Sequence, residues 1–169
     1  MACAQPRQPL TVRRRGVWVF VIVLVFTGFP DRLLRAQSQE LFDNWLSDAD
    51  GYTQAMQEHH KTKKPLLVYF YTDWCPYCRR LNQEIIASEP VQTYLARIVR
   101  VRINPERDER ESALANKYHI QGFPSLFLFP AAAKRPLQLS TYRWSETGWV
   151  LMTPEEFVHM CQTAEGFHE

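Results

Sequence analysis

The chain has 169 residues, of which 46% are hydrophobic and 22% are charged, and this composition excludes a disordered or fibrous protein. Its formal net charge of +2 comes from the N-terminus, because residues 37–169 carry 14 Lys and Arg against 17 Asp and Glu. That balance gives no sign of a basic surface for nucleic acid. We expect one ordinary domain and a shorter N-terminal segment.

The first 36 residues have the pattern of a targeting segment. Four arginines within residues 7–15 precede the uncharged run 16–29, which as a helix spans about 21 Å, short for a membrane core and typical of a signal peptide. The charges favour export of the chain beyond this run. A signal cleaved after Ala36, an uncleaved membrane anchor and an ordinary buried segment stay open. The first two place the domain in the periplasm or an equivalent secreted location, and the second anchors it to the inner membrane; thiol–disulfide chemistry is expected in such a compartment.

The next segments predict the start of an alternating fold. Spaced apolar residues in 37–60 predict one or two amphipathic helices, an N-terminal extension to a domain at residues 61–169. The continuous apolar run 65–72 is too short for a helix and predicts a buried central strand. Helical spacing of apolar residues in 75–87 predicts that a helix follows this strand directly.

The rest of the chain continues this alternation. The predicted elements are a short helix, a second strand, a charged helix with a solvated face, a third strand, a fourth strand hairpinned to the third, and a last helix, at residues 88–96, 97–104, 106–118, 124–130, 137–144 and 153–164. Thr153, Pro154 and Glu156 form a capping-box signal for the last helix. The order predicts an α/β fold with a mixed central sheet flanked by helices.

Two cysteines stand at the junction of the central strand and the following helix, in the sequence Trp-Cys-Pro-Tyr-Cys. Cys75 lies at the helix N-terminus, where free N–H groups and the helix dipole favour the thiolate, the species that attacks disulfides. Cys78, one turn further, is placed to attack the resulting mixed disulfide. Pro76 preorganises the first turn and has no N–H to lose.

Other chemistries for this pair are alternatives. A zinc half-site needs a second pair of ligands, and the sequence has no second Cys-x-x-Cys. A structural disulfide also stays open. So does a copper-delivery protein, although such proteins usually place their two cysteines four residues apart. We expect no metal and no cofactor. Cys161 is predicted to be a small buried residue, with a redox role as the alternative.

Four further residues, His119 and three aromatic residues, have predicted locations. His119 is predicted to lie on the surface beside the active-site loop. Tyr142, Trp144 and Trp149 are predicted to pack in the core or across the hairpin. A partner-binding patch is the alternative, because the segment 142–150 is longer than a hairpin at this position needs.

Three segments together resemble the thioredoxin-fold thiol–disulfide oxidoreductases. Residues 68–78 (VYFYTDWCPYC) resemble the strand and active site of this family, residues 101–104 its intervening strand, and residues 117–129 (KYHIQGFPSLFLF) the segment that holds its cis-proline. The resemblance covers about residues 60–130. It is greatest to exported thioredoxin-like proteins related to the C-terminal domain of the reductant conduit DsbD.

This resemblance implies a thioredoxin fold and a set of roles. Cys75 is the expected nucleophile and Cys78 the resolving thiol. The residues expected to shape the site are Trp74, Pro76 and Tyr77, and those expected to contact substrate are Phe123 and Pro124. If its peptide bond is cis, Pro124 presents backbone to a substrate peptide.

The sequence also departs from the family. The buried carboxylate usual six residues before the first cysteine is replaced by Tyr69, so proton handling falls to water or another group. The Pro-Tyr pair between the cysteines, as in many glutaredoxins, predicts a reduction potential of about −200 to −230 mV, more oxidising than thioredoxin. No Gly-Gly signature for glutathione follows Pro124.

The resulting hypothesis is an exported thiol–disulfide oxidoreductase that works in the reducing or isomerising direction. Its expected partners are client proteins with thiols or disulfides and a membrane-bound electron donor, since an oxidising compartment supplies no electrons. Residues 16–29 offer a membrane anchor, and no nucleic acid is expected. The alternatives are a net disulfide oxidant and a non-catalytic adaptor or chaperone that uses the peptide groove of the fold.

Overall fold

The computed structural model describes residues 41–131, 133 and 135–166. The segment predicted as a signal peptide or membrane anchor, residues 1–36, lies outside the described residues. Within them, every helix is too short or too polar to serve as a membrane span.

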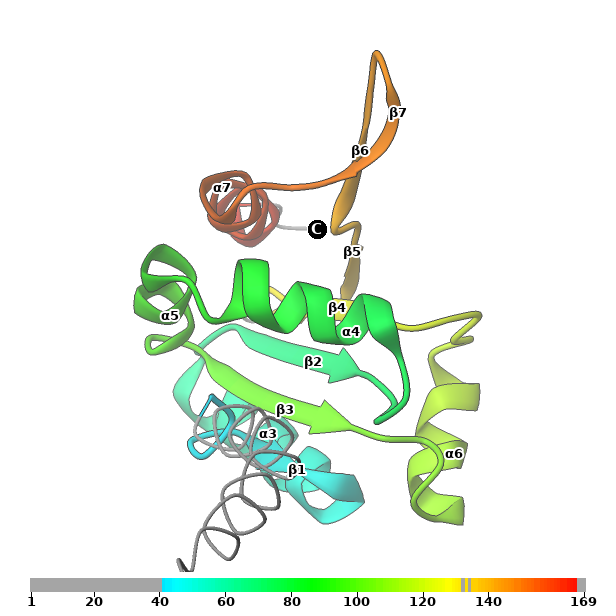
Figure 1. Cartoon of the computed structure of the whole chain (residues 1–169). Coiled ribbons are helices and arrows are strands. Elements are labelled where there is room, and N and C mark those ends of the chain that lie inside the picture. Colours follow the sequence, from blue (N-terminus) through cyan, green and yellow to red (C-terminus); the bar gives the residue numbers. More distant parts are fainter. Residues whose placement is uncertain (1–40, 132, 134, 167–169) are drawn as a thin grey trace, which may run out of the picture. The chain divides into compact units, whose positions relative to one another are not determined.

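A mixed sheet forms the centre of the described fold (Figure 1). Its five strands, in the order β1-β3-β2-β4-β5, are β1 (Leu46–Ser47), β3 (Val99–Ile103), β2 (Leu66–Phe70), β4 (Ser125–Phe129) and β5 (Leu137–Leu139). β1 and β2 run parallel to β3, whereas β4 is antiparallel to β2 and β5. The predicted α/β class with a mixed central sheet is confirmed.

β2 is the central strand, and all of its residues are buried. Successive side chains point to opposite faces, so that Leu67 and Tyr69 join one core cluster while Leu66, Val68 and Phe70 join the other. Burial on both faces explains why the sequence here is continuously apolar and does not alternate.

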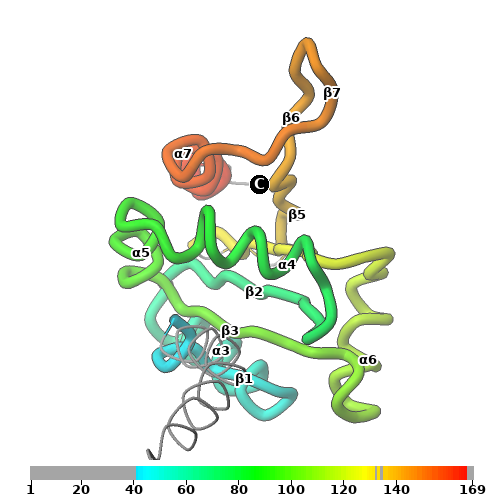
Figure 2. Tube along the Cα trace, viewed as in Figure 1, coloured from blue at the N-terminus to red at the C-terminus, as the bar shows by residue number. Residues whose placement is uncertain are grey.

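Helices cover both faces of the sheet (Figures 1 and 2). One face carries α4 (Pro76–Leu81), the π-helical turn η1 (Asn82–Ile86), α5 (Glu89–Leu95) and α7 (Pro154–Glu165). The other carries α3 (Asp48–Thr62) and α6 (Glu109–Lys117). The helix predicted over 75–87 is therefore α4 continued by η1, and the capping box predicted at Thr153 is present in α7.

Part of the segment predicted as an N-terminal extension packs on this sheet. Leu46 of β1 pairs with Val101 of β3, and Tyr52 and Ala55 of α3 lie in the core cluster on that face. The chain from Leu41 onward forms one compact unit.

The fourth predicted strand is divided in the structure. Residues 137–139 pair with β4 as predicted, but the prediction is wrong for 142–144, which leave the sheet. There β6 (Tyr142–Ser145) and β7 (Gly148–Leu151) form a separate antiparallel hairpin. The Ser140 hydroxyl donates to the carbonyl oxygen of Tyr142 at 2.7 Å, a local bond that competes with strand pairing.

The prediction that the charged run 106–111 forms a solvated helix face is wrong for Glu111. This side chain is buried, and its Oε2 accepts a hydrogen bond from the backbone N–H of Asn104 at 2.7 Å. The first turn of α6 packs over the end of β3, where that N–H has no strand partner. Glu111 satisfies it.

Candidate active site

Cys75 and Cys78 lie where β2 ends and α4 begins. Cys75 is the N-cap of α4, Pro76 is its first residue, and the sulfur of Cys75 accepts a hydrogen bond from the backbone N–H of Cys78 at 3.1 Å. Both cysteines are free thiols that are 2% exposed. An N–H directed at sulfur stabilises negative charge there, which is the condition for a nucleophilic thiolate.

The segment before β4 closes the site from another part of the chain. The Phe123–Pro124 peptide bond is cis, as the resemblance implied. The Cys75 thiol donates to the carbonyl oxygen of Phe123 at 3.5 Å, across 48 residues of sequence. Because Ser125 pairs with Phe70, antiparallel pairing of β4 with β2 brings this segment to the end of the strand that leads to Cys75.

A pocket of about 520 Å³ adjoins the cysteine pair through Tyr77, which lies between the two cysteines, and Phe123, whose carbonyl oxygen contacts Cys75. Phe123 and Pro124 form one part of its wall, and Tyr77 and Tyr142 form another. His119 also lines it and is exposed, as predicted for a surface residue beside the site. The predicted substrate-contacting residues and Tyr77 therefore surround one opening.

Trp74 lies on the surface next to Cys75, with 61% of its side chain exposed. Its indole N–H donates to both carboxylate oxygens of Glu106, at 3.0 and 2.9 Å. Glu106 was not among the predicted site residues. It comes from the loop after β3, so the parallel pairing of β2 and β3 brings it to the site.

Asn104 braces the active-site loop from the same neighbouring strand. Its side-chain NH₂ donates to Asp73 Oδ2 at 3.2 Å, and its Oδ1 accepts from the backbone N–H of Glu106 at 3.1 Å. Sequence reasoning missed this buried residue. The available signal was its place directly after a buried parallel strand, at the edge where the strands' carboxyl ends meet.

Tyr69 occupies the position of the missing carboxylate. Its hydroxyl donates to Asn82 Oδ1 at 3.1 Å, and burial raises its pKa well above the usual range, so it stays a neutral hydrogen-bond donor. Burial, together with a hydrogen bond to Cys75, raises the pKa of the Cys78 thiol to about 12. Asp73 accepts from Asn104 instead of reaching this thiol.

Cys161 lies apart from this chemistry. It is completely buried in α7, which confirms the predicted small buried residue. Burial raises the pKa of its thiol to about 12, and its polar neighbours are Tyr94 and Glu165. A thiol held protonated inside the core is a poor nucleophile.

The described residues contain no cluster of three or more His, Cys, Asp or Glu that could hold a metal ion. His59, for example, is buried in α3, and its Nδ1 lies 2.6 Å from the carbonyl oxygen of Lys64. This is a structural contact at the end of a helix.

Two of the three singled-out aromatic residues are exposed. Trp144 and Trp149 pack edge to face across the β6–β7 hairpin with ring centroids 5.5 Å apart, and each is 68% exposed. The predicted hairpin packing is confirmed and the predicted core packing is wrong for this pair. Tyr142 is half-buried, and its ring packs edge to face on Tyr77 at 6.5 Å.

The fold and the cysteine pair place the chain in the class of thioredoxin-like oxidoreductases. It belongs to the thioredoxin-like family, whose model matches residues 44–131. Protein disulfide-isomerase of Triticum aestivum is 33% identical over 87 residues, 51% of this chain and 16% of that protein. A protein disulfide-isomerase of Schizosaccharomyces pombe is 35% identical over 86 residues, 48% of this chain and 22% of that protein. The matched region is thus about a fifth of these relatives or less.

Solved structures show the same fold at low sequence identity. The DsbH oxidoreductase has a TM-score of 0.57 at 19% identity and covers 73% of this chain and 85% of its own. A thioredoxin from Thermus thermophilus has 0.53 at 21%, covering 68% and 86%. The oxidised C-terminal domain of DsbD from Neisseria meningitidis has 0.52 at 19%, covering 71% and 98%. The predicted thioredoxin fold is confirmed.

Proposed function

We propose that the protein exchanges disulfides with client proteins through Cys75 and Cys78, in the reducing or isomerising direction and outside the cytoplasm. One observation carries the chemistry. The sulfur of Cys75 lies between the N–H of Cys78 at 3.1 Å and the carbonyl oxygen of Phe123 at 3.5 Å, beside an open pocket. Attack on a client disulfide requires a polarised sulfur that a client can approach, and here the pocket and the backbone of Phe123 lie next to that sulfur.

The reaction proceeds in two exchanges. The Cys75 thiolate attacks one sulfur of a client disulfide, so that a Cys75–client disulfide forms and the first client thiolate leaves. The Cys78 sulfur then attacks Cys75, releases the second client thiolate and leaves a Cys75–Cys78 disulfide. Two electrons and two protons pass from the cysteine pair to the client. A dithiol donor must reduce the pair again.

The reducing or isomerising direction is supported by the resemblance of residues 60–130 to exported thioredoxin-like proteins related to the C-terminal domain of the reductant conduit DsbD. The name of the relatives, protein disulfide-isomerase, agrees with this direction.

Export is supported by the targeting pattern of residues 1–36. In an oxidising compartment the reduced pair needs a membrane-bound donor. Fractionation of cells that express the full chain with a C-terminal tag tests this placement. We expect the tag to be accessible to protease outside the cytoplasmic membrane, and a tag protected in intact spheroplasts would contradict the export proposal.

Equilibration with a glutathione redox buffer tests the direction. We expect a potential for the Cys75–Cys78 couple of about −200 to −230 mV. A value near about −120 mV, that of a strong oxidant, overturns the reducing assignment. We also expect Cys75→Ser to abolish reduction of insulin disulfides. Full biological activity in the double Cys75→Ser/Cys78→Ser variant would instead assign the protein as an adaptor.

A further inference from the structure

The β6–β7 hairpin stands beside the active site, because Tyr142 at its base packs on Tyr77. It spans residues 142–151, beyond the family match at 44–131, and projects from the end of β5 next to α7 (Figure 1). A two-stranded hairpin is marginally stable alone, so its orientation depends on contacts at its base.

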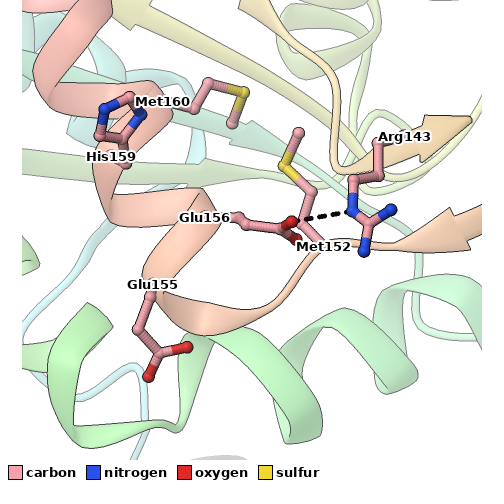
Figure 3. Close-up of a pocket in the computed structure, with 6 residues that line it drawn as sticks. All are labelled: Arg143, Met152, Glu155, Glu156, His159 and Met160. Carbon is pink, nitrogen blue, oxygen red and sulfur yellow. Dashed lines mark ion pairs between the residues drawn. The ribbon is translucent and has the colours of Figure 1, made fainter.

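An ion pair joins the hairpin to α7. Arg143 of β6 binds Glu156 of α7 with 2.8 Å between Nε and Oε1, and Figure 3 shows the arginine directed toward this helix beside Met152. The backbone N–H of Met152 also donates to the carbonyl oxygen of Thr141 at 3.0 Å and closes the base. The face that holds Arg143 is therefore turned toward α7.

The opposite face of the hairpin is aromatic. Because side chains alternate along a strand, Tyr142 and Trp144 lie on the face opposite Arg143, and the register places Trp149 across from Trp144. Tyr142 packs on Tyr77, which lies between the two cysteines. We call Tyr77, Tyr142, Trp144 and Trp149 the aromatic stripe.

The aromatic stripe begins in the pocket beside Cys75. Tyr77 and Tyr142 line that pocket together with Phe123 and Pro124, and the two tryptophans continue the stripe about 7 Å further along β6. Both indoles are 68% exposed, so much apolar surface faces water. When a client is bound through its sulfur to Cys75, the client residues next to that sulfur are within reach of the aromatic stripe.

We propose that the aromatic stripe binds client polypeptides and selects those that carry aromatic or aliphatic side chains a few residues from the reacting cysteine. This inference rests on the proposed function. The occupant is apolar because the one charged side chain of β6, Arg143, faces α7 and is already paired. The occupant is a polypeptide because the stripe extends beyond the pocket, and a small disulfide bound in the pocket is too short to reach the two tryptophans.

Two disulfide-linked peptide substrates test the selection with the wild-type chain. They have the same length and charge, and one carries Phe and Leu near the cysteine where the other carries Ser. We expect a KM about tenfold lower for the apolar peptide, equivalent to about 1.4 kcal/mol. Equal KM values with active turnover of both peptides overturn the inference and leave the proposed function standing. Failure to reduce even a small aromatic disulfide overturns the proposed function itself.

Variants then assign the selection to the hairpin. We expect Trp144→Ser/Trp149→Ser to reduce the tenfold preference to about twofold or less. Leu137→Ser, which removes another exposed apolar side chain, on β5, is the matched control and should keep it. A preference that survives the double variant overturns the inference. Sedimentation velocity tests whether a second copy of the chain occupies the stripe instead. A dimer that the double variant abolishes also overturns the inference.

Discussion

The hydroxyl of Tyr69 and the side-chain oxygen of Asn82 lie 3.1 Å apart in a hydrogen bond, one helical turn beyond the buried thiol of Cys78. A neutral phenol thus stands where thioredoxins usually hold a carboxylate. Its raised pKa keeps it a protonated phenol that cannot take the proton of Cys78, but its one O–H can turn from Asn82 to the Cys78 thiolate as that thiolate forms. Tyr69 is a positioning residue for the second exchange.

We therefore expect Tyr69→Phe to slow the second exchange about fivefold, the effect of one net hydrogen bond of about 1 kcal/mol. Attack by Cys75 on the client should be unchanged, so the Cys75–client disulfide should accumulate. Acid-quenched gels measure both steps. Tyr71→Phe is the matched control, because the Tyr71 hydroxyl accepts a hydrogen bond from Arg107 at 3.2 Å. Equal resolution rates in wild type and Tyr69→Phe would contradict the role.

The pKa of Cys78 predicts the pH dependence of the second exchange. Below a pKa of about 12 the thiolate fraction rises tenfold with each pH unit. We expect the resolution rate to rise in the same way from about pH 6 to about pH 9. Stopped-flow release of a fluorescent client peptide measures it. A plateau below about pH 8 would show that Cys78 ionises far more easily than its burial indicates.

Glu111 predicts a pH dependence of stability. Burial raises the pKa of its carboxyl above the ordinary 4.5, although the hydrogen bond from Asn104 lowers it. As pH rises above this value the unfolded chain releases the proton first, so the wild type loses stability through the window up to the raised pKa. Glu111→Gln removes this loss. Urea unfolding should show equal stabilities near about pH 4 and a more stable variant at neutral pH, whereas a less stable variant contradicts the assignment.

Asn104 tests the brace between the two loops. Asn104→Ala removes both side-chain hydrogen bonds of a buried residue, those to Asp73 and Glu106, and should lower the free energy of unfolding by about 2–3 kcal/mol. Because Asp73 precedes Trp74, the attack step should slow as well. Asn116→Ala, at an exposed position of α6, is the control. A loss below about 0.5 kcal/mol would show that the brace contributes nothing measurable.

Sequence patterns predicted the parts of the fold that local physics determines. Continuous apolarity identified β2 as central, and the junction of β2 with α4 placed Cys75 at a helix start. Pro124 was predicted near the cysteines from family resemblance, because only strand pairing across 48 residues brings its segment there. Glu111 was misjudged, since a carboxylate in a charged run looks solvated until the neighbouring strand end is known.

The β6–β7 hairpin is a second case in which local sequence did not predict burial correctly. The sequence predicts residues 142–144 as the end of a strand of the sheet, and tryptophan is highly buried on average. The local turn at Ser140 takes these residues out of the sheet, and the tertiary ion pair of Arg143 with Glu156 joins the hairpin to α7. Their exposure became visible only in the structure.

Trapping the first intermediate tests the central claim most directly. A Cys78→Ala variant is incubated with a disulfide-containing client, quenched with acid and mapped by mass spectrometry without reduction. We predict one mixed disulfide, between Cys75 and the client, that the wild type resolves and Cys75→Ser does not form. A client adduct on Cys161, or no adduct while the wild type still reduces the client, would contradict the assignment of Cys75 as the nucleophile.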